Sequence, residues 1–193
     1  MTHASGEEAC FGPMRVLQAG CCTLEPQVEA HAPEMFAVLT DPAIYEFERE
    51  PPPSVERLAT GYRRLESRRS PDGGEAWLNW VVRLPTGELT GYVQASVTDR
   101  GVACVGYEFA SRFWRRGLAS ASLRAMFAEL ASRYRADLAV AVLKRANYRS
   151  SGLLRKLGFA EPTASDRAAA VDHEDDEIVL QRALSVVGPA PGT

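Results

Sequence analysis

The sequence predicts an α/β fold, a sandwich built on a mixed and mostly antiparallel sheet. Three observations predict it: two helical segments come first, three β-rich segments with short turns follow, and strands then alternate with helices. The chain has 193 residues, enough for one hydrophobic core. Its 46% of hydrophobic and 24% of charged residues indicate a globular protein rather than a disordered or membrane-embedded one.

Two helices are expected near the start of the domain. Pro33 lies just inside the apolar segment 30–39 and suits a first helical turn, where the missing N–H costs nothing. The three prolines at 51–53 then break the chain. Ser54 can cap a second helix over residues 54–69.

A sheet is expected after the turn signal at residues 71–74. PTG and DRG turns join three short β-rich segments, which predicts an antiparallel meander over 76–84, 88–97 and 102–109. In the remaining part of the chain, helices alternate with strands. They are a helix at 116–134, an apolar strand at 137–143, a short helix at 147–159 that runs into another strand, and a last strand at 176–184.

Residues 14–184 are expected to form the domain, with flexible tails at 1–13 and 185–193. The first residues include acids where a signal peptide needs basic residues, and no apolar run reaches the roughly 20 residues of a membrane span. The expected location is therefore the cytoplasm, without a membrane partner. The four cysteines are too few and scattered for a disulfide framework and are expected to be packed or surface thiols: Cys10, Cys21, Cys22 and Cys104.

The charge of the chain is unevenly distributed. Net charge is −3, but residues 111–156 hold eleven basic and two acidic residues, a local charge of +9. The remainder therefore carries −12. A basic segment can bind an anion, although a solvated basic face is the plainer interpretation. A nucleic-acid-binding domain would rest on this segment alone, and the acidic remainder argues against it.

A phosphate-binding loop is predicted between residues 106 and 119. A strand ends there, an arginine-rich loop follows, and a helix begins at Gly117. Main-chain N–H groups at a helix start favour an anion, and glycine lets a phosphate approach the backbone closely. Arg115 and Arg116 add positive charge. With one glycine, the loop matches neither the dinucleotide fingerprint nor the P-loop.

Two segments resemble the GNAT superfamily of acetyltransferases. Trp114-Arg-Arg-Gly-Leu-Ala119 is similar to the acetyl-CoA pyrophosphate loop of the branch that contains ribosomal-protein N-terminal acetyltransferases. Residues 147–159, with Asn147, Ser150 and a final Leu-Gly-Phe, resemble the family's Asn-x-x-Ser helix. The resemblance extends more weakly over residues 14–184. It implies a GNAT-type sheet with helices on both faces and a splayed pair of parallel strands.

The resemblance also implies roles for residues. The pyrophosphate would lie on the main chain of Arg115, Arg116, Gly117, Leu118, Ala119 and Ser120, and pantetheine on that of Phe109 and Ala110. Asn147 would bind the pantetheine arm or the region of the attacking group, with Ser150 or Ser151 beside it. Two plainer interpretations remain: Asn147 is only a helix N-cap, and Leu157-Gly158-Phe159 is only a helix stop.

The reaction implied is direct transfer of an acetyl group from acetyl-CoA to an amine, without a metal. An amine attacks only as the neutral base, so a general base is useful. Glu108 is the candidate because it lies on the strand that leads into the loop, where the resemblance implies that the reactive end of acetyl-CoA emerges. A solvated strand-edge glutamate is the alternative. Several relatives use a tyrosine as general acid where this chain has Leu154, so Ser150, Ser151 or water would replace it.

The identity of the acceptor stays open. A protein N-terminus, a lysine or a small-molecule amine would each suit, and the acids Glu46, Glu48 and Glu50 could receive a cationic acceptor or be merely solvated. His173 lies among acids that more readily form a solvated turn than a metal site. The rival hypothesis is an acyl-CoA-binding module without turnover. A homodimer is one option, because paired subunits are common in such proteins.

Overall fold

The computed structural model describes residues 13–47 and 50–185, which form one seven-stranded sheet in the order β1 to β7. Its strands are β1 (Leu17–Gln18), β2 (Thr23–Pro26), β3 (Glu75–Arg83), β4 (Leu89–Thr98), β5 (Val102–Phe109), β6 (Leu138–Lys144) and β7 (Glu177–Ala183). All neighbouring strands pair antiparallel except β5 and β6, which are parallel. The predicted fold class is therefore confirmed.

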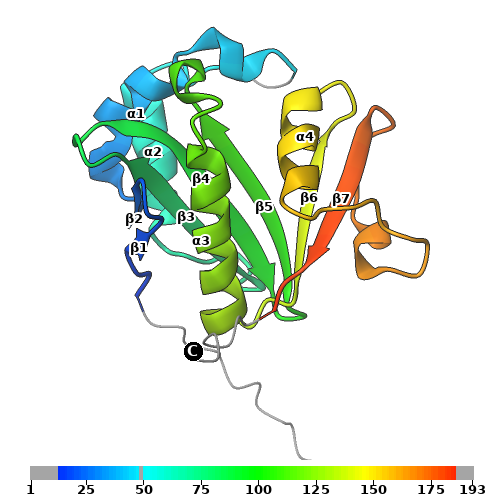
Figure 1. Ribbon diagram of the computed structural model, residues 1–193. Helices are drawn as coiled ribbons and strands as arrows, with labels where there is room; N and C mark the ends of the chain where they lie inside the picture. Colours follow the sequence, from blue (N-terminus) through cyan, green and yellow to red (C-terminus); the bar gives the residue numbers. More distant parts are fainter. Residues whose placement is uncertain (1–12, 48–49, 186–193) are drawn as a thin grey trace, which may run out of the picture.

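The parallel pair of strands holds together only at one end. Residues Val102–Cys104 of β5 pair with Leu138–Val140 of β6, and beyond them the two strands diverge (Figure 1). β4 stays paired with β5 as far as Phe109, so the sheet opens on one side of β5 only. The splayed pair that the resemblance implied is present.

Four helices cover the sheet (Figure 1). They are α1 (Ala32–Leu39), α2 (Val55–Leu65), α3 (Leu118–Arg133) and α4 (Tyr148–Lys156), with short 3-10 helices η1 (Glu29–His31), η2 (Pro42–Tyr45), η3 (Ser111–Phe113) and η4 (Arg167–Ala170). Phe127 of α3 lies 5.7 Å, between ring centroids, from Phe159 behind α4, so these two helices share one face. α1 and α2 pack on the other face.

Three local features place the helices as the sequence predicts. Pro33 lies in the first turn of α1. The Ser54 hydroxyl accepts a hydrogen bond from the Arg57 N–H at 3.3 Å and caps α2. The side-chain oxygen of Asn147 accepts one from the Ser150 N–H at 3.0 Å and caps α4. Gly158, with a left-handed φ of 87°, then ends α4 before the buried Phe159.

The structure corrects one predicted element and adds two. The strand expected after the short helix is reduced to a single bridge between Ala160 and Gln181. The edge hairpin of β1 and β2 was not predicted, because a two-residue strand and a four-residue strand that ends in Pro26 give no alternating pattern. Of the two predicted tails, residues 1–12 and 186–193 lie outside the described residues.

Candidate active site

The opening between β5 and β6 exposes one side of the β5 backbone. The Ala110 N–H donates a hydrogen bond to the carbonyl of Thr90, near the start of β4, at 3.0 Å. The main-chain groups of Ala110 therefore face β4. Because the two sides of an antiparallel strand alternate, the main-chain groups of Phe109 and Tyr107 point the other way, towards the gap. Of the two residues predicted to pair with pantetheine, Phe109 therefore faces the gap, whereas the N–H of Ala110 is already used within the sheet.

The predicted phosphate loop forms the start of α3. Gly117 is the N-cap, with a φ of 80°, and Arg115 is also left-handed with a φ of 62°. The first N–H groups of a helix have no partner within it, and glycine offers no side chain to cap them. Leu118 buries its side chain in the core, Ala119 and Ser120 are half-buried, and Arg115 and Arg116 are exposed. The loop thus presents main-chain donors and two cations to an anion.

Trp114 joins this loop to the end of β5. Its indole N–H donates to the Phe109 carbonyl at 2.7 Å. The guanidinium of Arg149, in the first turn of α4, lies 4.9 Å from the centroid of the Trp114 ring and also forms an ion pair with Glu46. These contacts connect the phosphate loop, α4 and the segment after η2. Arg149 was not predicted, because its partner Glu46 lies about a hundred residues away in the sequence.

The start of α4 lies on the other side of the gap from β5. Asn147 acts as its N-cap through the side-chain oxygen, as the plainer interpretation held, and its amide nitrogen takes no part in that bond. The Ser151 hydroxyl accepts a long 3.4 Å hydrogen bond from the Arg155 side chain. Ser150 instead neighbours Tyr107 of β5. Leu154 is buried in the core.

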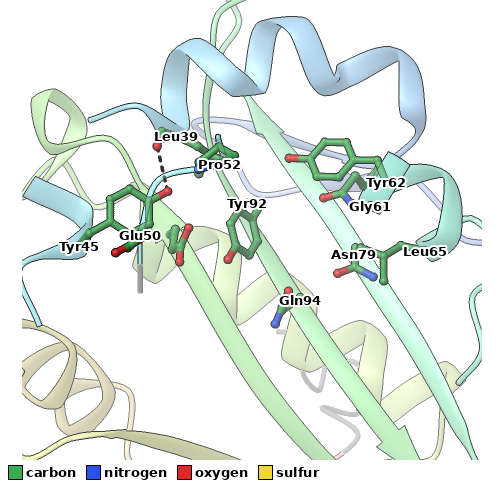
Figure 2. Close-up of a pocket in the computed structure, with 12 residues that line it drawn as sticks. Leu39, Tyr45, Glu50, Pro52, Gly61, Tyr62, Leu65, Asn79, Tyr92 and Gln94 are labelled. Carbon is green, nitrogen blue, oxygen red and sulfur yellow. Dashed lines mark hydrogen bonds between the residues drawn. The ribbon is translucent and has the colours of Figure 1, made fainter. Parts of the chain in front are cut away.

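Glu108 faces a cavity of about 300 Å³ on the α2 face of the sheet. In Figure 2, Tyr45 and Glu50 lie on one side of this cavity, Tyr62 and Asn79 on the other, and Tyr92 and Gln94 of β4 between them. Its remaining lining residues are Gln27, Leu39, Pro52, Gly61 and Leu65. We call this space the acceptor cavity. Glu50 is thus brought to it, Glu46 is paired with Arg149 instead, and Glu48 lies outside the described residues.

Two polar atoms of the acceptor cavity are buried without a hydrogen-bond partner in the described structure. They are the Tyr62 hydroxyl and the side-chain nitrogen of Gln27. Burial and the nearby Glu108 raise the pKa of Tyr62 well above its usual range, so the hydroxyl stays protonated near neutral pH. Since unpaired buried donors are costly, these two groups are ready to bind a polar ligand.

Neither a metal centre nor a membrane-spanning helix is found in the residues that the structure describes. No group of three or more potential ligand side chains comes together within 13–47 and 50–185. Over the same residues, no helix combines the length and apolar character needed to cross a bilayer. His173 hydrogen-bonds through its ring to the Val171 carbonyl at 2.9 Å in an exposed turn.

Comparison with a family model and with solved structures gives consistent matches. Residues 22–160 match the model described as an acetyltransferase (GNAT) domain. None of the curated protein sequences matches this chain.

Among solved structures, RimL, a ribosomal L7/L12 alpha-N-protein acetyltransferase in complex with coenzyme A, is 17% identical over 89% of this chain and 99% of its own, with a TM-score of 0.72. An acetyltransferase from Salmonella typhimurium that modifies the N-terminal serine of L7/L12 is also 17% identical, with coverage of 89% and 100% and a TM-score of 0.71. A ribosomal-protein-S5-alanine acetyltransferase from Vibrio fischeri is 14% identical, with coverage of 91% and 100% and a TM-score of 0.73. At these identities the likeness concerns the fold.

Proposed function

Because this chain belongs to the acetyltransferase (GNAT) family, we propose that it transfers an acetyl group from acetyl-CoA directly to an amine held in the acceptor cavity. The observation that carries the proposal is the position of Glu108. Its side chain lines the acceptor cavity, and its strand borders the gap between β5 and β6. An amine and an acyl donor can therefore meet beside this residue from opposite faces of the sheet.

The residues at the gap fit acetyl-CoA. The uncapped start of α3, left-handed at Gly117, and the exposed Arg115 and Arg116 suit a pyrophosphate. The main chain of Phe109 faces the gap, where an extended pantetheine arm can lie along it like an added strand. Asn147 borders the same gap. When bound, acetyl-CoA supplies an activated thioester carbonyl.

Glu108 would accept the proton of the amine. Deprotonating a lysine-like ammonium of pKa 10.4 at pH 7 costs roughly 4.6 kcal/mol, and an α-amino group of pKa near 8 only about 1.4 kcal/mol. A carboxylate at the wall of the cavity lowers this barrier by taking the proton as the amine attacks. Glu50, at another wall of the same cavity, adds negative charge that attracts the ammonium form.

The acceptor that the cavity suits best is the α-amine of a polypeptide. Gln27 and Tyr62 offer unpaired buried donors, which a peptide carbonyl next to the amine can accept from and a polyamine cannot. Two of the neighbours named above, RimL and the Salmonella typhimurium acetyltransferase, act on the N-terminal amine of ribosomal protein L7/L12, which supports the same class. We expect the reaction to take place in the cytoplasm, as the sequence predicts.

A thiol-release assay tests the proposal. Acetyl-CoA is supplied with matched acceptors: short peptides with a free N-terminus, the same peptides with a blocked N-terminus and an internal lysine, and polyamines. Release of coenzyme A with the free N-termini, and slower release with the other two sets, is the expected result. Acetyl-CoA binding without release for any amine would instead favour the acyl-CoA-binding module.

A further inference from the structure

Tyr107 and Glu108 are consecutive residues of β5, so their side chains point to opposite faces of the sheet. Glu108 faces the acceptor cavity on the side of α2. Tyr107 faces the side of α3 and α4, packs against the core there, and neighbours Ser150 at the start of α4. It lies three residues beyond Cys104, the last residue of β5 that pairs with β6, and thus beside the gap.

The Tyr107 hydroxyl is buried and makes no hydrogen bond of normal geometry within the described residues, although the Ser150 side chain lies close enough to act on it. Leaving such a group unpaired costs stability, and replacing it by a hydrogen is neutral or favourable for folding. Burial raises the pKa of Tyr107 to about 12, with the Ser150 side chain acting in the opposite direction, so the group remains a hydrogen-bond donor throughout the pH range of amine acetylation.

We propose that the Tyr107 hydroxyl donates a hydrogen bond to the sulfur of the acyl donor as the carbon–sulfur bond breaks. This inference rests on the proposed function. The new bond forms between the amine nitrogen and the carbonyl carbon, and Glu108 takes the amine proton on the α2 side. The electron pair of the broken C–S bond stays on sulfur, on the other side of β5. Tyr107 stabilises that thiolate without losing its proton, and the thiolate is protonated by water after release.

This arrangement replaces a group that the chain lacks on α4. Leu154 stands where some relatives have a tyrosine, and it is buried in the core at 1% exposure. Ser151 is bonded to Arg155. Tyr107 instead belongs to β5, three residues beyond the last residue of that strand that pairs with β6. A preorganised donor aimed at a developing negative charge typically contributes about 10²–10³-fold to the rate.

The test compares Tyr107→Phe with the parent and with Tyr134→Phe, which removes a buried tyrosine hydroxyl at the far end of α3. The first readout needs no turnover: coenzyme A is bound to each protein, and the ultraviolet absorbance of its thiolate is followed against pH. A charge-assisted hydrogen bond from Tyr107 should lower the pKa of the bound thiol, so the titration in Tyr107→Phe should move upwards by about one to two pH units. Tyr134→Phe should titrate like the parent.

The second readout is kinetic. In Tyr107→Phe we expect kcat to fall by about 10²-fold, with an unchanged or higher melting temperature and nearly unchanged affinity for coenzyme A. Weaker binding of coenzyme A with parental kcat would place the hydroxyl on a pantetheine amide and overturn the proposal, as would parental values throughout. If the bound thiol has a lower pKa in the parent than in Tyr107→Phe but the parent shows no turnover, the Tyr107 hydrogen bond is retained and the proposed function is overturned.

Discussion

The indole of Trp114 donates its N–H to the carbonyl of Phe109 at 2.7 Å, which closes the turn between β5 and the phosphate loop. This bond occupies one of the two main-chain groups of Phe109 on the side of the gap. The Phe109 N–H is thereby left as the main-chain donor on that side, where we propose that the pantetheine arm lies. The same indole ring supports the Arg149 guanidinium, so the Trp114 side chain contacts both the end of β5 and the first turn of α4.

Trp114→Phe should weaken acetyl-CoA binding more than it destabilises the fold. It removes a hydrogen bond whose net contribution is about 1 kcal/mol and a cation–π contact of similar size. The loop should then populate several conformations, and affinity should fall by about tenfold in calorimetry. The control is Trp77→Phe, which loses a comparable indole bond to Glu75 at 2.9 Å at the opposite end of the sheet. Equal losses of affinity in both variants would contradict the assignment.

Gly117→Glu should abolish the stabilisation that acetyl-CoA gives by mass action. A carboxylate at the start of α3 repels the pyrophosphate, and a side chain at a φ of 80° adds roughly 1–2 kcal/mol of strain. Gly73→Glu is the matched control, since Gly73 has a φ of 77° and, like Gly117, has open space around a built Cβ. Melting curves with and without acetyl-CoA separate the two effects. A parental ligand shift in a folded Gly117→Glu protein would remove this loop from the cofactor site.

Reversing the charges of Arg115 and Arg116 should weaken acetyl-CoA binding far more than binding of pantetheine fragments without phosphates. Both side chains are exposed, so salt should screen their attraction and lower the affinity of the parent for acetyl-CoA. Reversal of Arg100 and Arg135, exposed at the other end of the sheet, should have little effect. If phosphate-free fragments lost as much affinity as acetyl-CoA, the two arginines would act through the fold of the loop.

The sequence predicted the family, and the match of residues 22–160 to the GNAT domain confirms it. It also predicted the four helices and the strands of the sheet's centre, because these elements carry caps and periods that are local in sequence. Pro33, Ser54 and Asn147 each lie within three residues of the groups that they serve. Local chemistry therefore sufficed for the frame of the fold and for the start of α3 at Gly117, whereas phosphate binding by that loop stays a prediction.

Features that depend on distant residues could not be predicted. The strand expected after Gly158 pairs at one residue only, because whether a segment joins a sheet depends on the strand beside it. The ion pair of Glu46 with Arg149 took one predicted acid away from the acceptor cavity. The unpaired hydroxyls of Tyr62 and Tyr107 became visible only when burial was known. Nothing in a tyrosine's sequence neighbours indicates that its hydroxyl lacks a partner.

Burial of Tyr107 should also make the fold sensitive to alkali. Its pKa rises from 10 to about 12 on folding, so between these values the unfolded chain binds fewer protons than the folded one, and stability falls as pH rises. Raising the pH from below 10 to above 12 should lower the free energy of unfolding by about 2.7 kcal/mol through this group. Tyr107→Phe should flatten the decline of the denaturation midpoint between pH 10 and 12. A decline as steep as the parent's would contradict the burial of this hydroxyl.

Glu108→Gln tests the base itself. The amide keeps the size and polarity of the side chain but cannot accept a proton, so kcat should fall by about 10²–10⁴-fold while acetyl-CoA affinity barely changes. The defect should shrink as pH approaches the pKa of the acceptor amine, because more amine is then already neutral. The control is Glu161→Gln, an exposed glutamate paired with Arg155 beyond α4. Stopped-time assays of thiol release across pH 6–10, with one peptide acceptor at saturation, provide the measurement.

Turnover equal to the parent's over that whole range would remove Glu108 from the mechanism. A loss of kcat that stayed constant with pH would assign Glu108 to binding of the ammonium instead of to proton transfer.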